Sequence, residues 1–174
     1  MSGITVMELA PDEVVARRAA LARVHRAAFG KDDAYAEVYR EVELPEMAAH
    51  AGFRCVVAHE RGDLVGFALG YDATADGVWY GNVAAGVRTT RLRAWLTGAW
   101  YLADIAVLPE RQGQGIGSRL HDRLVGMVPQ RDLVLITFPG DHPAVGFYLR
   151  HGWRVLDAGF EYCPGAAPTT LMGR

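Results

Sequence analysis

The sequence predicts a mixed α/β domain, and three features indicate it. Short apolar or alternating runs typical of strands are separated by longer runs with helical spacing, and a glycine-rich segment joins a strand to a helix. The chain of 174 residues has the length of one ordinary domain, and its 51% hydrophobic and 22% charged residues are typical of a soluble globular protein. We therefore expect a single domain over residues 1–174, with six to seven strands and about four helices.

The expected strands are apolar or alternating runs rich in β-branched and aromatic residues. They cover residues 4–9, 53–59, 64–71, 100–108 and 133–138, with a last strand or pair of strands from Trp153 onward. Arg61-Gly62-Asp63 has the composition of a tight turn, so the second and third strands are expected to form a hairpin.

The expected helices have apolar residues at helical spacing. They cover residues 12–29, 32–49, 115–127 and 141–150. Gly30 should end the first helix, and Pro45 should break or kink the second. Asp141 is the candidate cap of the last helix, with Pro143 tolerated in its first turn.

Residues 72–97 follow neither period and are interpreted as an insertion between strands, partly helical near its end. The segment contains Trp79, Tyr80 and Trp95. These side chains are expected either to line an acceptor pocket or to fill a core, and the sequence does not separate the two.

Charge and composition exclude several classes of function. The 18 basic and 20 acidic residues give a net charge of −2, so nucleic-acid binding is not expected. No run is long enough to span a bilayer and no signal-peptide pattern opens the chain, so we expect a cytoplasmic protein without a membrane partner. The two cysteines are expected to be reduced thiols, and the six histidines show no metal-ligand spacing, so no metal is expected.

The glycine-rich segment, Gln112 to Ser118, carries the most chemical information. Gly113, Gly115 and Gly117 alternate with other residues, which allows the backbone to turn sharply and expose its N–H groups. The helix that follows adds unpaired N–H donors and about half a positive charge at its N-terminus. The segment therefore predicts a site for a pyrophosphate.

Two other phosphate-binding patterns fit less well. A P-loop requires a lysine that is absent here, and the dinucleotide fingerprint requires a glycine at the position of Ser118. A plain strand-to-helix turn accounts for one glycine and leaves the other two unexplained. An oxidoreductase that binds NAD(P) at this loop remains a third alternative.

At these residues the sequence resembles the GNAT family of N-acetyltransferases. The family signature is Gln/Arg-x-x-Gly-x-Gly/Ala after a strand, which Gln112-Gly113-Gln114-Gly115-Ile116-Gly117 matches. Farther along, residues 144–153 resemble the family's Ala-x-x-Phe-Tyr-x-x-x-Gly-Phe segment. Two motifs in family order are more specific than either alone, and the resemblance covers residues 100–156.

The resemblance implies a central, mostly antiparallel sheet and an enzyme that uses acetyl-CoA. It assigns the cofactor and catalytic core to residues 100–156. The backbone of one strand segment would pair with the pantetheine arm, as an added strand would, and the glycine-rich segment would hold the pyrophosphate. The cofactor-binding residues implied in this way are Ile105, Ala106, Val107, Gln112, Gly113, Gln114, Gly115, Ile116, Gly117 and Ser118.

The implied reaction is direct transfer of an acetyl group to a primary amine of a small molecule or peptide within a ternary complex. An alkyl amine with a pKa near 10.4 is neutral in about one molecule in a few thousand at pH 7. Either a base must take its proton, or the pocket must favour the neutral amine by desolvation. Tyr148 occupies the family's usual position for the proton donor to the thiolate. Asp104, on the strand next to the implied thioester position, is the candidate base, or else a structural acid. The family often carries a glutamate on this strand, and none lies between residues 98 and 108, which leaves base catalysis by water or by another loop open.

The acceptor is not identified by the sequence. The acidic stretch 32–46 lies where the resemblance places the acceptor site, and Asp33, Glu37 and Glu41 are expected either to attract a cationic amine or to form a solvated helix face. A non-catalytic domain that binds acyl-CoA as a sensor is the alternative function. The resemblance also makes a homodimer plausible.

Overall fold

The computed structural model describes residues 3–73, 83, 85–87, 90–128, 131–162 and 165–174. It confirms the mixed α/β fold: its seven strands form one sheet in the order β1-β2-β3-β4-β5-β7-β6. The chain forms two compact units, and strand β4 contributes to both. The first unit contains residues 1–71 and 103–129, and the second contains residues 72–102 and 130–174.

The first unit is built on antiparallel strands. They are β1 (Ile4–Leu9), β2 (Arg54–Glu60) and β3 (Asp63–Asp72), followed in the sheet by β4 (Trp100–Val107). A two-residue turn joins β2 to β3, with φ of 53° at Arg61 and 91° at Gly62. Positive φ at both positions matches the twist of a hairpin, so the predicted hairpin is confirmed.

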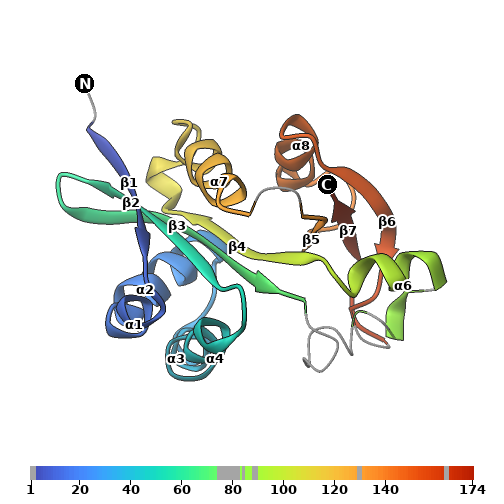
Figure 1. Cartoon of the computed structure of the whole chain (residues 1–174). Helices are drawn as coiled ribbons and strands as arrows, with labels where there is room; N and C mark the ends of the chain where they lie inside the picture. The colour runs from blue at the N-terminus through green and yellow to red at the C-terminus, as the bar shows by residue number, and fades with distance from the viewer. Residues whose placement is uncertain (1–2, 74–82, 84, 88–89, 129–130, 163–164) are drawn as a thin grey trace. The chain divides into compact units, whose positions relative to one another are not determined.

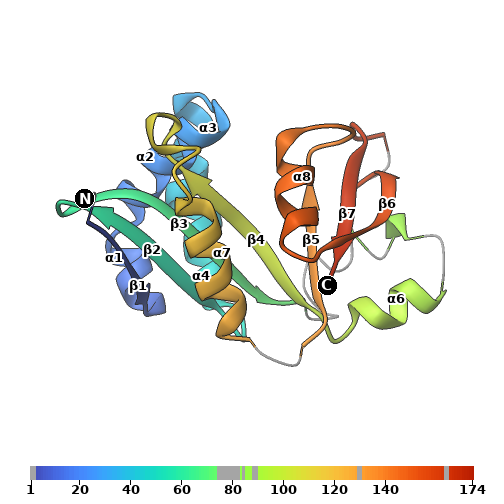
Figure 2. The same cartoon turned by 90° about the horizontal axis from the view of Figure 1, so that it is seen from above.

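Helices cover both faces of these strands, with α7 on one face and α1 to α4 on the other (Figures 1 and 2). Their bounds are α1 (Pro11–Ala16), α2 (Arg18–Phe29), α3 (Asp33–Val38), α4 (Leu44–Ala49) and α7 (Ile116–Gly126). Helix α2 buries Leu21, Val24 and His25 along one face, and Gly30 ends it with φ of 62°, as predicted. A single 3-10 turn, η2 (Pro109–Arg111), leads from β4 toward α7.

The helical stretch that contains Pro45 does not break. A π-helical turn, η1 (Tyr39–Glu43), joins α3 to α4, and the N–H of Leu44 donates to the carbonyl of Tyr39, five residues earlier. Pro45 has no N–H to donate and lies in the first turn of α4, where a proline is tolerated. The predicted break is therefore wrong, because a change of helical pitch accommodates the proline.

The second unit continues the sheet. Its elements are α6 (Thr90–Leu96), β5 (Leu133–Thr137), α8 (Pro143–Arg150), β6 (Arg154–Phe160) and β7 (Thr169–Gly173). The start of β4 pairs in parallel with β5 through Trp100 and Tyr101, and β7 pairs antiparallel with both β5 and β6. The predicted final pair of strands is confirmed.

The core of the second unit contains side chains from α6, β5 and β7. Leu96, Val134 and Leu171 are fully buried there, and Trp95 packs against them while remaining partly exposed. A Cβ at Gly173 would approach the Trp95 ring to 2.6 Å, so this glycine allows the ring to lie against β7. Trp95 is therefore a core side chain, whereas Trp79 and Tyr80 lie outside the described residues.

The cap of α8 differs from the prediction. The residue before the helix is His142, and its Nδ1 accepts a hydrogen bond of 3.2 Å from the N–H of Ala144. Asp141 is exposed and does not cap the helix, while Pro143 lies in the first turn as expected. Within the described ranges, no helix has both the length and the apolar composition needed to cross a bilayer.

Candidate functional site

The glycine-rich segment forms an open turn at the N-terminus of α7. Gly113 and Gly115 have φ of 74° and 78°, values that residues other than glycine rarely adopt. The first hydrogen bond of the helix runs from the N–H of Arg119 to the carbonyl of Gly115, at 3.1 Å. The N–H groups of Ile116, Gly117 and Ser118 precede that bond and therefore lie in the unpaired first turn.

The space beside these glycines is free of other described side chains. Apart from the glycine itself and its two sequence neighbours, no described heavy atom lies within 4 Å of the position that a Cβ would take at Gly113 or at Gly115. Exposed N–H groups, a helix N-terminus and open space together make a site for an anion. The predicted cradle is therefore present as local geometry, with Gly117 inside the first helical turn.

Gln112 fixes the cradle to the end of β4. Its side-chain Nε2 donates to the carbonyl of Val107 at 3.0 Å. The N–H of Leu108, on the same peptide group, donates to Val65 of β3, so the Val107 carbonyl points away from β3. Gln112 therefore occupies one of the backbone acceptors that the prediction assigned to the pantetheine arm.

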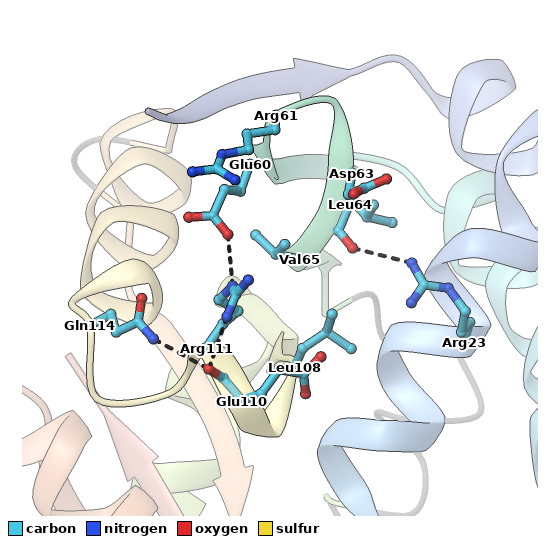
Figure 3. Close-up of a pocket in the computed structure, with 10 residues that line it drawn as sticks. All are labelled: Arg23, Glu60, Arg61, Asp63, Leu64, Val65, Leu108, Glu110, Arg111 and Gln114. Carbon is cyan, nitrogen blue, oxygen red and sulfur yellow. Dashed lines mark hydrogen bonds and ion pairs between the residues drawn. The ribbon is translucent and has the colours of Figure 1, made fainter. Parts of the chain in front are cut away.

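An ion pair holds the turn before the cradle against the β2–β3 hairpin. The Nε of Arg111 lies 2.7 Å from Oε2 of Glu60, across 51 residues of sequence (Figure 3). A polar hollow of about 640 Å³ lies beside this pair (Figure 3). Three arginines and three acids line it, namely Arg23, Arg61, Arg111, Glu60, Asp63 and Glu110. These three basic and three acidic side chains give the lining no net charge.

Asp104 is the candidate base, and it lies in the first unit on β4. Its side chain is 16% exposed. The hydroxyl of Tyr39, in the π turn, donates a hydrogen bond of 2.7 Å to Oδ2 of Asp104. Tyr39 itself is 1% exposed, so this donor is held inside the protein.

A histidine completes the surroundings of this carboxylate. Nε2 of His25, on α2, lies 3.8 Å from Oδ1 of Asp104, which is beyond hydrogen-bond length. The imidazole stacks on the Tyr39 ring, with centroids 3.8 Å apart and planes 17° apart. His25 is 4% exposed and also contacts the rings of Phe29 and Tyr35.

Burial changes the protonation of both groups. It raises the pKa of Asp104 from 3.8 to about 6, an effect that the Tyr39 hydrogen bond opposes and the Glu43 charge reinforces. Burial, with the charge of Lys31, lowers the pKa of His25 from 6.5 to about 4. At pH 7 Asp104 is therefore ionised and His25 is neutral.

A second carboxylate, Glu43, stands near this cluster. Its Oε2 accepts a hydrogen bond of 3.4 Å from the hydroxyl of Tyr35, and burial raises its pKa. The pKa of Tyr35 rises to about 12, mainly through burial and then through the charges of Glu43 and Asp104. The π turn thus supplies two side chains, Tyr39 and Glu43, that act on Asp104.

The other acids of the stretch 32–46 behave as a solvated helix face. Asp33 lies 2.9 Å from Arg26, and Glu37 and Glu41 both pair with Arg40. These acids are exposed and already have cationic partners. The structure favours the solvated face for them, and the half-buried Glu43 is the member of the stretch near Asp104.

Tyr148 lies in the second unit on α8. Its side chain is 8% exposed and meets the rings of Phe147 and Trp153 edge-on, with centroids 5.2 and 5.8 Å apart. These contacts fix the orientation of the phenol. They fit a core tyrosine and a proton donor equally well, so its catalytic role stays a prediction.

Sequence reasoning missed His25 and Tyr39. Both lie on apolar helical faces, where a buried aromatic side chain is the ordinary expectation. The available signal was a histidine on the buried face of α2 combined with an aspartate inside a strand. Because buried polar groups need partners, two titratable residues at core positions of different elements can be expected to contact each other.

Comparison with known proteins identifies the family. The model of the Acetyltransferase (GNAT) family matches residues 19–153. A crystal structure assigned to the GNAT family, from Desulfovibrio desulfuricans, is 22% identical and covers 98% of this chain and 97% of its own, with a TM-score of 0.66. The PaiA N-acetyltransferase of Thermoplasma acidophilum, solved with coenzyme A, is 14% identical and covers 99% and 98%, with a TM-score of 0.65.

One curated protein matches a shorter segment. The tRNA(Met) cytidine acetyltransferase TmcA of Saccharolobus islandicus is 37% identical over 54 residues, which are 31% of this chain and 7% of that protein. The family match is far longer, covers both sequence motifs and includes the cradle, Asp104 and Tyr148. The chain belongs to the GNAT family of acetyltransferases.

Proposed function

We propose that this protein transfers an acetyl group from acetyl-CoA to a primary amine of a small molecule or peptide, by direct transfer in a ternary complex. The observation that carries the proposal is the open cradle at the N-terminus of α7, in a chain of this family. A pyrophosphate needs convergent N–H donors and positive potential, and residues 112–118 offer both.

The remaining donor contacts would come from β4. Ile105, Ala106 and Val107 precede the cradle, and their backbone groups would pair with the pantetheine arm. Gln112 already occupies the Val107 carbonyl, so the Ile105 carbonyl is the acceptor we assign to the arm. Alternate peptide groups of a strand point to the same edge, which places the Ile105 carbonyl on the edge away from β3.

Asp104 is the proposed base. A base whose pKa lies near the working pH is both largely ionised and strongly basic. Burial raises the pKa of Asp104 to about 6. At pH 7 about nine in ten of these carboxylates are ionised. The amine proton would pass to Asp104, and the neutral amine would then attack the thioester.

Tyr148 is the proposed proton donor to the departing thiolate. A thiol of this type has a pKa of about 8.5 and a phenol one of about 10, so the transfer is uphill by about 1.5 pKa units. The proton that the attacking nitrogen loses as the amide forms would restore the phenol. The buried ring contacts of Phe147 and Trp153 hold the phenol in one orientation. We expect Tyr148→Phe to lower turnover at least ten-fold while the affinity for acetyl-CoA is kept.

The test of the function is release of free thiol from acetyl-CoA across a panel of amines, with the acetylated product identified by mass. We expect thiol release only when an amine is present, and equimolar acetylated amine. Thermal stabilisation by acetyl-CoA without thiol release from any amine would instead support the acyl-CoA-binding sensor. Binding of NAD(P) in place of acetyl-CoA would support the oxidoreductase.

A further inference from the structure

We infer that Tyr39 and His25 are positioning residues that hold Asp104 with one oxygen fixed inside the protein and the other available to the acceptor amine. The inference rests on the proposed role of Asp104 as the base. It concerns two side chains from helical elements that are far in sequence from the acid on β4.

Tyr39 accounts for one oxygen. Its hydroxyl donates to Oδ2 of Asp104 at 2.7 Å, a length typical of a hydrogen bond to an ionised acceptor. Because Tyr39 is 1% exposed, water does not compete for this bond. In the described part of the chain, Oδ1 of Asp104 accepts no hydrogen bond, so its lone pairs are available to a proton.

His25 accounts for the environment of the other oxygen. Its ring stacks on the Tyr39 ring, with centroids 3.8 Å apart, and meets the Phe29 ring at a tilt of 49°, with centroids 4.6 Å apart. The stack restricts the orientation of the Tyr39 ring. The nearest ring nitrogen, Nε2, lies 3.8 Å from Oδ1, which is too far for a hydrogen bond.

The charge of His25 matters as much as its position. A protonated imidazole beside Asp104 would form an ion pair and lower the pKa of the acid, which would weaken it as a base. Burial lowers the pKa of His25 to about 4, so the ring remains neutral at the pH where amines react. Among the described residues, its Nδ1 is buried without a hydrogen-bond partner, so that nitrogen has no acceptor to stabilise a charged ring.

Several other titratable groups face this cluster from the packed elements. Glu43 and Tyr35 approach from η1 and α3, and Cys55 approaches from β2. Burial raises the pKa of Cys55 to about 12, so the thiol stays neutral. Among the described residues, the charge of Glu43 raises the pKa of Asp104, whereas the Tyr39 hydrogen bond lowers it.

The test is a ¹³C NMR titration of the Asp104 carboxyl, assigned by its absence in D104N. Removing a hydrogen bond to a charged group should raise the pKa of Asp104 in Y39F by about one unit, toward 7. Y35F is the matched control, because that hydroxyl donates to Glu43, and it should leave the midpoint within about 0.3. H25A should lower the midpoint by admitting water, and H25F, which retains a ring, should not.

The same shift should appear in the rate. In Y39F, kcat/KM should fall about five-fold at pH 6 and change little at pH 8, which is the ratio of ionised fractions for midpoints of 6 and 7. A loss of stability alone would not move the acid limb. An unchanged midpoint and an unchanged acid limb in Y39F would overturn the positioning role.

A measurement on the unmodified protein covers the case in which Y39F fails to fold. The ¹³Cζ shift of Tyr39 should titrate with the midpoint of Asp104 and lose that step in D104N. A flat Tyr39 signal would overturn the inference. Failure of the proposed function has a different signature: D104N would keep full turnover while the Tyr39 signal still follows Asp104.

Discussion

Replacement of Asp104 by asparagine should stabilise the protein at neutral pH while it removes the base. The folded protein raises the pKa of this carboxyl from 3.8 to about 6, chiefly because its side chain is only 16% exposed. Between these two pH values the folded state binds more protons than the unfolded state, so stability falls as pH rises. The destabilisation is complete above pH 6 and absent below 3.8.

The size of the effect follows from the shift. A difference of about 2.2 pKa units at about 1.36 kcal/mol each corresponds to about 3 kcal/mol at pH 7.5. Asparagine has the same shape and no charge, and the Tyr39 hydroxyl can still donate to its oxygen. D104N should therefore raise the free energy of unfolding by up to about 3 kcal/mol at pH 7.5 and by less than about 1 kcal/mol at pH 4.

The assay is urea unfolding of both proteins at the two pH values. D141N is the matched control, because Asp141 is exposed and does not cap α8, and it should stay within about 0.5 kcal/mol at both. A D104N protein that is less stable than the wild type at pH 7.5, or a difference that persists at pH 4, would refute the reasoning. The first result would mean that the carboxylate is favourably solvated or paired in the folded state, and the second that the difference does not come from the ionisation of Asp104.

Three further outcomes follow from the structure. Since burial lowers the pKa of His25 from 6.5 to about 4, the stability of the wild type should fall as pH drops from 6.5 to 4. Over that range the free energy of unfolding, measured in urea, should fall by about 3 kcal/mol less in H25F than in the wild type. G115V requires a branched side chain at φ of 78° in the cradle, so calorimetry should show at least ten-fold weaker acetyl-CoA binding, whereas unchanged affinity would contradict the cradle. G66V places a Cβ 2.9 Å from the carbonyl of Ala106, so thermal unfolding should show a loss of about 2 kcal/mol, and a neutral result would mean that β3 and β4 can separate there at little cost.

The features that the sequence predicted well are local. The hairpin, the final strands and the turn before α7 depend on residues a few positions apart, such as Gly62 and Gly115, whose positive φ is a property of the backbone itself. The family motifs lie in the same segments. These signals can be read from neighbouring residues without knowledge of the tertiary structure.

The features that the sequence did not predict depend on tertiary contacts. Tyr39 meets Asp104 across 65 residues, and nothing near either residue indicates the other. The acidic stretch was ambiguous for the same reason: Asp33 pairs with Arg26 of the preceding helix, while the charge of the half-buried Glu43 acts on Asp104. Pro45 was misleading because the rule for prolines assumes regular helical pitch, and the π turn changes it.

The most direct test of the central claim is the pH dependence of kcat/KM for acetyl transfer, measured on the best amine of the panel. The wild-type protein should show an acid limb with a midpoint near 6, where Asp104 ionises. D104N should lose at least a hundred-fold in rate at pH 7.5 and should lack that limb. Full turnover in D104N with the same limb would contradict the assignment of Asp104 as the base.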